Sequence, residues 1–446
     1  RESGVLQHGW LYEVKELPSA DALMLFVQTA QRLAADYDLA QDESHITRIC
    51  RLVSGLPLGV ELAAAWTRVM SCADIAAELG RRSTALASPL RDAPERHRSL
   101  QAVFDYSWQL LTPVEQRSLA ALTVFRGGFT REAAQVVAGA STTVLLGLVN
   151  QSLVQKSPAG RFDLHELVRQ YLEDKAIEID ALADRHAAYY ADFLAHREAW
   201  LHDDRQTTAF SDMRAEIDNA RRMWQRAIQG GNAAIFQRAL RGLCWIYDAH
   251  GRPTEGAALL AEAATTLEPD PTQHALRGQL LARQARFLVV LGQFDQVEAV
   301  CHQAEVLSRE VGDLPTEAFL VRLLGYCQVV AGNLQTAYSL MARCLEMYRQ
   351  TDDLPGTCEA LNSLAIVQNN LGEYAAAYEC LLEAEAHAQT LQDAINHSIA
   401  LSNLGSTAYY QRQFDQAGRY FQASYEIDAA QHDRRRMAVN LHNVAC

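Results

Sequence analysis

The sequence predicts a mostly all-α protein whose second half is an α-solenoid of helical hairpins. The first observation is a repeat with a period of about 40 residues, marked by turn residues at Gly292, Gly332, Gly372 and Arg412, with a looser copy at Gly251. In each copy a large apolar or aromatic residue stands two positions after the turn residue: Phe294, Leu334, Tyr374 and Phe414. A small or modest residue comes next: Val297, Ala337, Ala377 and Ala417. A fixed period of this length indicates stacked hairpins, because one hairpin cannot bury its apolar stripe alone.

The second observation is a composition typical of an ordinary folded chain. The 446 residues are 49% hydrophobic and 21% charged, enough for about three domains. The sequence contains neither a membrane-spanning apolar run nor a signal peptide. The net charge of −14 argues against general nucleic-acid affinity. The nine cysteines form no C-x-x-C pair, so we expect buried thiols, no metal site and a cytoplasmic location.

A tight corner between two helices is expected near residue 55. Helical patterning that includes Ile46 and Val53 stops at Ser54-Gly55. Pro57 then stands at the first position of a new helix, where its missing N–H is harmless. On residue patterns alone, this segment is an interhelical corner as readily as it is a ligand contact.

Residues 99–176 show the element order of a winged helix, which is the third observation. Thr112-Pro113-Val114-Glu115 predicts a capping box, and Thr130 caps a later helix. After a helix at about 142–152, two short strands flank the turn Pro158-Ala159-Gly160. His165 ends the second strand and opens the next helix. A histidine at such a strand end is more often a satisfied structural residue than a ligand.

These patterns divide the chain into four expected segments. Residues 1–90 form a helical domain, 91–180 a winged helix, 181–232 linking helices and 233–446 the repeats. The repeat register places Leu441 and Val444 inside the first helix of a further hairpin. Since no polar capping helix follows, and Arg1 does not open a natural start, we expect an excerpt of a longer protein whose last repeat is truncated.

Two short motifs resemble a known family. Gly55-Leu56-Pro57-Leu58 resembles the GLPL motif of STAND-class signalling NTPases, which include NB-ARC proteins and many bacterial transcriptional regulators. Residues 164–171, reading LHELVRQY, are similar to the MHD-type motif that ends their winged helix, with Leu164 and Glu166 in place of Met and Asp. Residues 98–101 and 125–130 also look like the bacterial members. The order implied is an ARC1-like helical domain, a winged helix and a tetratricopeptide-like sensor.

The resemblance implies nucleotide contacts at Gly55, Pro57 and His165, with Arg1 as the tail of a sensor-arginine segment. In the family the GLPL proline packs near adenine, and the MHD histidine binds the β-phosphate of ADP in the closed resting state. An imidazole N–H can donate to a phosphate oxygen, and a proline ring offers a rigid apolar surface. The resemblance therefore implies the regulatory and sensor part of an ATP/ADP-switched signalling protein, a bacterial transcriptional regulator.

The residues that grip and hydrolyse ATP are missing from this sequence. It has no G-x-x-x-x-G-K-[ST] loop, so the P-loop domain is absent from the chain. We expect ADP or ATP with Mg²⁺ in the intact protein, acting as a slow ATPase switch. We expect no hydrolysis and no tight nucleotide binding by this chain alone.

The repeats are expected to bind a protein or small effector along a concave groove, since tetratricopeptide-like stacking exposes one face of each first helix. The register places these residues there: Arg286, Arg322, Tyr326, Glu359, Asn362, Asn369, Asn370, Tyr409 and Tyr410. Tyr and Arg are common binding anchors, and paired Asn can bond an extended peptide. Alternatively, the two adjacent tyrosines simply pack between hairpins. We also expect that the active protein associates with itself, and that it contacts DNA only through an output domain outside this chain.

Two other interpretations stay open. The chain is alternatively a nucleotide-independent interaction scaffold whose first half only caps the solenoid. A third interpretation is direct DNA binding by the winged helix through Lys156 and Arg161. Residues 96–176 hold nine Lys and Arg against seven Asp and Glu, a net charge of +2, which is little for such a footprint.

Overall fold

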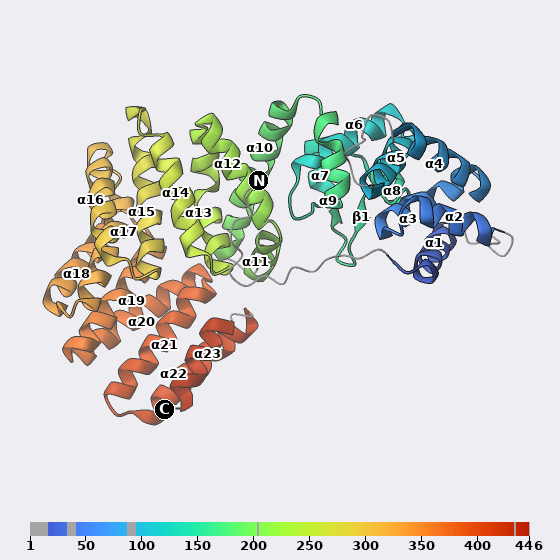
Figure 1. The fold of residues 1–446 in the computed structure, drawn as a ribbon. Coiled ribbons are helices and arrows are strands. Elements are labelled where there is room, and N and C mark those ends of the chain that lie inside the picture. The colour runs from blue at the N-terminus through green and yellow to red at the C-terminus, as the bar shows by residue number, and fades with distance from the viewer. Residues whose placement is uncertain (1–16, 34–41, 87–94, 203–204, 432–433, 446) are drawn as a thin grey trace. The chain divides into compact units, whose positions relative to one another are not determined.

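The computed structural model describes residues 17–33, 42–86, 95–202, 205–431 and 434–445. The chain forms two compact units that meet in sequence between Leu182 and Ala183. Nearly all described elements are helices (Figure 1). The predicted mostly all-α fold is confirmed.

The described residues of unit 1 form helices and one hairpin. Its first part comprises α1 (Ser19–Leu33), α2 (Glu43–Leu52), α3 (Pro57–Ala65), η1 (Trp66–Arg68) and α4 (Cys72–Leu86). Its second part comprises α5 (Glu95–Leu110), α6 (Pro113–Ala121), η2 (Leu122–Val124), α7 (Arg131–Ala138), α8 (Thr142–Asn150), β1 (Gln155–Lys156), β2 (Phe162–Asp163), α9 (Glu166–Leu172) and η3 (Glu173–Lys175). Helix α1 packs on α2 and α3, and α4 packs on α2 and α5.

Local sequence signals account for the helix starts of unit 1. The predicted capping box is confirmed: the Thr112 hydroxyl accepts the Glu115 N–H at 3.3 Å, and the Glu115 carboxylate accepts the Thr112 N–H at 2.8 Å. Thr130 caps α7 by accepting the N–H of Ala133 at 3.1 Å. The two predicted strands pair antiparallel, with Gln155 opposite Asp163.

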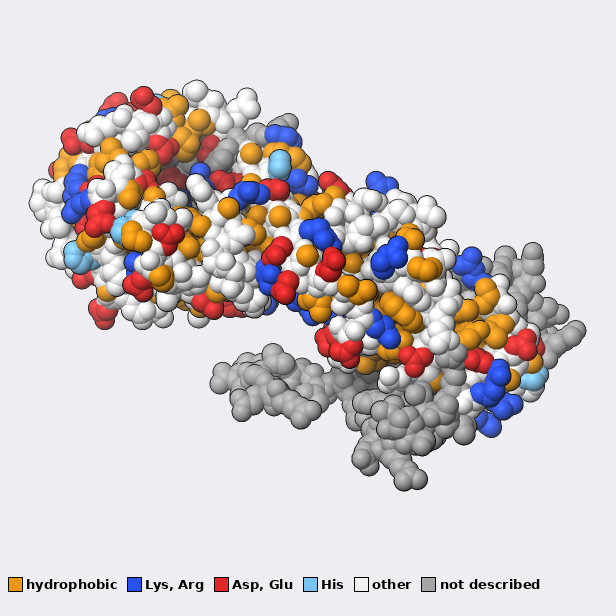
Figure 2. All heavy atoms as spheres, turned by 90° about the horizontal axis from the view of Figure 1, so that it is seen from above, with side chains coloured by type: hydrophobic (Ala, Val, Ile, Leu, Met, Phe, Trp, Pro, Cys, Tyr) orange, Lys and Arg blue, Asp and Glu red, His pale blue; other side chains and the backbone are white. Residues whose placement is uncertain are grey.

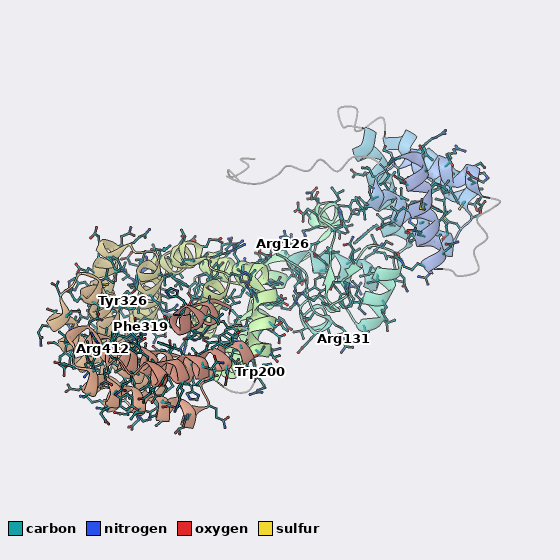
Figure 3. All side chains as sticks on the ribbon, turned by 90° about the horizontal axis from the view of Figure 1, so that it is seen from below. Arg126, Arg131, Trp200, Phe319, Tyr326 and Arg412 are labelled. Atoms are coloured by element: carbon teal, nitrogen blue, oxygen red, sulfur yellow. The ribbon has the colours of Figure 1, made fainter. Side chains whose placement is uncertain are left out.

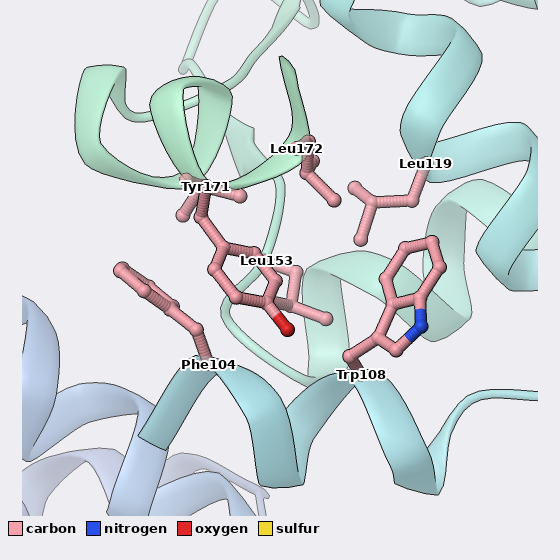
Figure 4. A pocket seen from close by; sticks show the side chains of 7 residues that line it. Phe104, Trp108, Leu119, Leu153, Tyr171 and Leu172 are labelled. Atoms are coloured by element: carbon pink, nitrogen blue, oxygen red, sulfur yellow. The ribbon is translucent and has the colours of Figure 1, made fainter. Parts of the chain in front are cut away.

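The second part of unit 1 has a closely packed core between α5 and α9. The side chains that line it are Phe104, Trp108, Leu119, Leu153, Val168, Tyr171 and Leu172. Figure 4 shows Tyr171 reaching from α9 toward Phe104 and Trp108 of α5. The space they enclose has no room for a water molecule. We therefore regard it as core rather than as a ligand site.

Unit 2 is an α-solenoid. Helix α10 (Ile179–Ala199) crosses the boundary after Leu182 and leads into it. The next elements are η4 (Trp200–His202), α11 (Gln206–Ala215), α12 (Ile217–Gly230), α13 (Ala233–Ala249), α14 (Pro253–Thr266), η5 (Pro271–Gln273) and α15 (His274–Val290). The later helices are α16 (Phe294–Val311), α17 (Leu314–Val330), α18 (Leu334–Gln350), α19 (Leu354–Leu371), α20 (Tyr374–Leu391), α21 (Ala394–Tyr410), α22 (Phe414–Ala430) and α23 (Arg434–Ala445). Each helix from α14 onward packs chiefly on its neighbours in sequence. This arrangement confirms the predicted tetratricopeptide-like hairpins.

Turn and cap residues recur with the period of the repeat. Gly332 and Gly372 both have φ of +80°, and Arg412 takes the same turn position with φ of +61°. Glycine adopts this left-handed conformation without steric cost, whereas arginine does not. The first helices α17, α19 and α21 are each capped by an aspartate whose carboxylate accepts the backbone N–H of the third helical residue: Asp313 from Thr316, Asp353 from Gly356, and Asp393 from Asn396. These periodic caps fix where each hairpin begins.

The solenoid curves until its two ends meet. Helices α13, α15, α17, α19 and α21 also pack on one another in turn, which places them on the inner side of the curve. At the ends, the Thr207 hydroxyl at the start of α11 donates to the side-chain oxygen of Gln431 after α22, at 3.1 Å. Figure 2 shows unit 2 hollowed at its centre.

In the described ranges, no individual helix combines the length and apolar character needed to cross a bilayer. The pair α7 and α8, bent by 108°, meets those criteria only when its two helices are taken together.

Candidate functional site

The predicted corner before Pro57 is built by two consecutive left-handed residues. Ser54 has φ of +55° and Gly55 has φ of +60°, which turns the chain sharply after α2. The Gly55 N–H donates to the Cys50 carbonyl at 2.9 Å, and the Gly55 carbonyl accepts the Leu17 N–H at 3.0 Å. Pro57 is partly buried and is the first residue of α3, as predicted.

His165 is the N-cap of α9. Its Nδ1 accepts the backbone N–H of Leu167 at 3.2 Å. A neutral imidazole whose Nδ1 accepts a hydrogen bond carries its proton on Nε2. Among the described residues, Nε2 has no hydrogen-bond partner. The partly buried ring therefore keeps one N–H donor for a group outside this network.

Arg169 fixes the backbone on both sides of His165. Its buried guanidinium donates to the carbonyls of Thr123 and Phe125, at 3.0 and 2.5 Å. It also lies 3.3 Å from the Glu166 carboxylate and 3.6 Å from that of Asp163. These contacts tie β2 and the start of α9 to the segment after α6, so Arg169 sets the position of His165.

A second arginine converges on the same carbonyls. Arg126, labelled in Figure 3, donates to Thr123 at 3.0 Å and to Phe125 at 3.3 Å. Burial lowers the pKa of Arg169, and the nearby charge of Arg126 lowers it further. The carboxylates of Asp163 and Glu166 raise this pKa but do not outweigh the lowering. The sequence reasoning missed Arg169, although it lies inside the MHD-like motif four residues after His165.

Helix α5 connects the two motif helices, since α3 and α9 both pack against it. On the α3 side, the indole N–H of Trp66 donates to the Ser107 hydroxyl at 3.0 Å, and the Trp66 ring lies 4.5 Å from that of Tyr106. On the α9 side, the Tyr171 hydroxyl donates to the Asp105 carboxylate at 2.7 Å. Helix α3, which begins at Pro57, and helix α9, which follows His165, are therefore linked through α5. Arg1 lies outside the described residues.

The two basic residues of the hairpin contact the protein itself. The ammonium of Lys156 lies 5.9 Å from the Phe162 ring centroid. The guanidinium of Arg161 donates to the Gly127 carbonyl at 3.4 Å. The first contact lies within the hairpin, and the second ties the hairpin to the segment before α7.

The charged residues predicted for the groove lie on inner helices and form ion pairs between successive hairpins. Arg322 Nη2 lies 2.6 Å from Glu359 Oε2, and Arg286 pairs with Asp248. Tyr326 is 48% exposed and lies one turn after Arg322; Figure 3 labels it. These positions leave Tyr326 accessible to a partner.

The prediction for two groove asparagines is corrected by their burial. Asn362 donates to the Cys358 carbonyl at 3.0 Å and accepts from the Asn403 amide at 3.1 Å. Asn369 donates to the Thr407 hydroxyl at 2.9 Å. Both side chains are buried because the next hairpin covers them. The repeat register predicts the helix face of each asparagine but not this cover. Asn370 remains exposed and bonds the Ile366 carbonyl of its own helix at 2.8 Å.

The tyrosine pair belongs to an exposed aromatic cluster. Tyr410 stacks on Tyr374 with ring centroids 5.9 Å apart, and Tyr409 meets Phe414 edge-on at 5.6 Å. Tyr409 and Tyr410 are 41% and 52% exposed. The tyrosines therefore pack between hairpins, as the alternative expected, and still present surface to solvent. Their role in binding a partner stays a prediction.

Arg283 on α15 is a candidate site residue that the sequence reasoning missed. Its guanidinium carbon lies 4.4 Å from the ring centroid of Phe319. Among the described residues it makes neither an ion pair nor a hydrogen bond. The lack of a partner depends on how neighbouring hairpins stack, so no residue pattern could have shown it.

Comparisons with known proteins give relatives but no matching family model. The chain is 31% identical over 369 residues to the protein named "Putative HTH-type transcriptional regulator Rv0890c" of Mycobacterium tuberculosis, and equally to "Putative HTH-type transcriptional regulator Mb0914c" of Mycobacterium bovis. Each match covers 76% of this chain and 40% of the relative. The chain thus spans 40% of the length of these curated relatives. "Uncharacterized protein Rv0894" of Mycobacterium tuberculosis is 37% identical over 118 residues, which are 26% of this chain and 30% of that protein.

Solved structures that align with this chain share little of its sequence. The STAND protein with a tetratricopeptide repeat sensor, PH0952, from Pyrococcus horikoshii aligns with a TM-score of 0.47 and 13% identity, over 97% of this chain and 79% of that chain. A Rap protein complexed with competence and sporulation factor aligns with a TM-score of 0.40 and 10% identity, over 96% of this chain and 97% of that chain.

Proposed function

We propose that this chain is the regulatory and sensor part of an ATP/ADP-switched transcriptional regulator of the STAND type. The relatives named as helix-turn-helix regulators, 31% identical over 76% of this chain, support a regulatory role. In this proposal residues 1–90 are the ARC1-like helical domain and 91–180 the winged helix. Residues 181–232 link them to the sensor repeats of 233–446, and the protein works in the bacterial cytoplasm.

The observation that carries the proposal is the bonding of His165. Because Nδ1 accepts the Leu167 N–H, the proton of the neutral ring lies on Nε2, where no described residue accepts it. ADP, when bound, supplies phosphate oxygens that accept such donors. In our proposal His165 holds the β-phosphate, while Pro57 and Gly55 line the adenine. The ATP-gripping loop and the Mg²⁺ ligands belong to a domain outside this chain.

Helix α5 supplies a route by which the two motifs can act together. A displacement of α9 that carries His165 away must break the bond between Tyr171 and Asp105. The contacts of Trp66 with Ser107 tie the other motif helix to the same element. Effector binding to the repeats would favour the conformation in which these contacts are lost, which is how a ligand shifts a two-state equilibrium.

The solenoid supplies the sensor surface in this proposal. The inner helices present Tyr326 and several arginines to a protein or small effector. We place DNA contact in a domain outside this chain, because the chain carries a net charge of −14. Active self-association would also use surfaces of the longer protein.

The test is the nucleotide content of the full-length protein purified from its host. The protein is denatured, and the released small molecules are identified by chromatography. We expect about one ADP per chain, because the resting state retains its nucleotide. A folded protein that releases none would contradict the switch and favour the nucleotide-independent scaffold.

A further inference from the structure

Four arginines lie together on the inner helices α13, α15 and α17: Arg241, Arg283, Arg286 and Arg322. We call them the inner arginine cluster. Three have carboxylate partners. Arg241 lies 3.1 Å from Glu198, Arg322 lies 2.6 Å from Glu359, and Arg286 pairs with Asp248. Arg283 alone of the four has no carboxylate among the residues that the structure describes.

The position of Arg283 is fixed by an aromatic ring. Phe319 of α17 is buried, and Figure 3 labels it in the solenoid. The Arg283 guanidinium carbon lies 4.4 Å from its ring centroid, and that of Arg322 lies 5.2 Å from the same point. A ring attracts a cation much more weakly than a carboxylate does. Arg283 is therefore held in place but not neutralised.

The two arginines beside Phe319 differ in electrostatics. Burial lowers the pKa of Arg283, and the charges of Arg241 and Arg286 lower it further. Cys244 and Glu359 act in the opposite direction but do not outweigh this effect. Burial also acts against the charge of Arg322, but Glu359 and Tyr348 outweigh it, so its pKa is raised. The carboxylate of Glu359, which pairs with Arg322, is the main difference between them. The inner arginine cluster has one positive charge more than its paired carboxylates.

We propose that Arg283 receives the carboxylate of an acidic side chain in an extended peptide that lies along the inner face of the solenoid. This inference rests on the proposed sensor function and names its ligand class. A single uncompensated guanidinium matches a carboxylate in charge and fork geometry. The recess at the centre of unit 2 gives the peptide its path (Figure 2).

Exposed apolar residues on the next two inner helices define the rest of the peptide. Tyr326 of α17 and Ile366 of α19 each stand six residues before a turn glycine, Gly332 and Gly372, and so occupy equivalent repeat positions. They are 48% and 43% exposed. Packed helices lie about 10 Å apart, which an extended chain crosses in about three residues. The ligand should therefore carry an acidic residue with apolar residues on one side of it at steps of about three.

A selection from a display library of random nonapeptides tests this ligand class. The targets are the 446-residue chain, its Arg283→Gln variant and the control Arg343→Gln. Arg343 lies on α18, is 47% exposed and pairs with Glu317 of α17 at 2.7 Å. The control therefore removes the same charge from a helix outside the inner set. We expect the unaltered chain and the control to enrich acidic peptides with the predicted apolar spacing. Arg283→Gln should bind the best of them about tenfold more weakly.

Three outcomes of the selection would overturn the inference. One is enrichment of peptides without acidic residues, and another is the same enrichment on Arg283→Gln. The third is that the unaltered chain enriches no peptide. Nucleotide release is not measured here, so failure of this inference and failure of the proposed switch are told apart.

Thermal unfolding without ligand gives a second, independent measurement. An unneutralised charge costs stability, so Arg283→Met should melt at or above the temperature of the unaltered chain. Arg322→Met should melt lower, because it leaves Glu359 without its partner. If Arg283→Met melts as low as Arg322→Met, Arg283 is a structural residue and the inference is wrong.

Discussion

The hydroxyl of Tyr171 donates to the carboxylate of Asp105 at 2.7 Å and thereby joins α9 to α5. The same helix α5 receives the indole N–H of Trp66 through Ser107. The segments that carry His165 and Pro57 are thus attached to one element. Any account in which the two motifs act together depends on these attachments.

Replacing Tyr171 by Phe should lower the free energy of unfolding by about 1–2 kcal/mol, because a hydrogen bond to a carboxylate is lost while the ring stays. The measurement is urea unfolding of the chain. Tyr338→Phe is the matched control, since Tyr338 makes no hydrogen bond among the described residues. Equal effects of the two variants would show that the bond to Asp105 contributes nothing.

Replacing Arg169 by Met should cost about 2–4 kcal/mol, because two carbonyls and two carboxylates lose a buried partner. Arg126→Met should cost less. It removes bonds to the same carbonyls but relieves the repulsion that Arg126 exerts on Arg169. Unfolding of both variants by urea checks the order, and a larger loss for Arg126→Met would contradict it.

Asn369→Ala should destabilise the solenoid by about 1–2 kcal/mol, since it leaves the buried Thr407 hydroxyl without its donor. Asn370→Ala, next to it, should change stability by no more than about 0.5 kcal/mol, because that side chain is exposed. Chemical unfolding distinguishes the two. An equal loss would mean that burial does not separate the roles of these neighbours.

The buried cysteines predict a loss of stability at alkaline pH. Burial raises the pKa of Cys301, Cys344 and Cys358 from 9.0 to about 12. The folded state therefore holds these protons more tightly than the unfolded state. Their stabilising contribution is complete below about pH 9 and is lost as pH rises toward 12, at about 1.4 kcal/mol per thiol by pH 10.

Urea midpoints at pH 8 and pH 10 measure this alkaline effect. Cys344→Ala is the control, because it should lose less stability between the two pH values than the unaltered chain does. An equal loss in both proteins would contradict the assignment to Cys344.

The repeat, its turn residues and the corner before Pro57 were predictable because each depends on local sequence. A glycine at Gly332 is needed for a φ of +80°, and a proline at position 57 begins a helix wherever the helix lies. The periodic caps Asp313, Asp353 and Asp393 carried the same kind of signal but were not recognised.

Contacts between distant elements were not predictable in this way. The register gives the helix face of Asn369 but not the Thr407 hydroxyl that covers it. The unpartnered state of Arg283 and the closure between Thr207 and Gln431 depend on the stacking and curvature of the whole solenoid. Such properties accumulate over many hairpins and leave no local pattern.

The central claim is that His165 binds nucleotide through Nε2, apart from its role as a helix cap. Asparagine is a strong N-cap but has no imidazole, so His165→Asn separates the two roles, while His165→Ala removes both. The most direct measurement is the rate of ADP release from the full-length protein carrying each change. The account predicts faster release for both variants and near-normal stability for His165→Asn. Release from His165→Asn at the rate of the unaltered protein would contradict it.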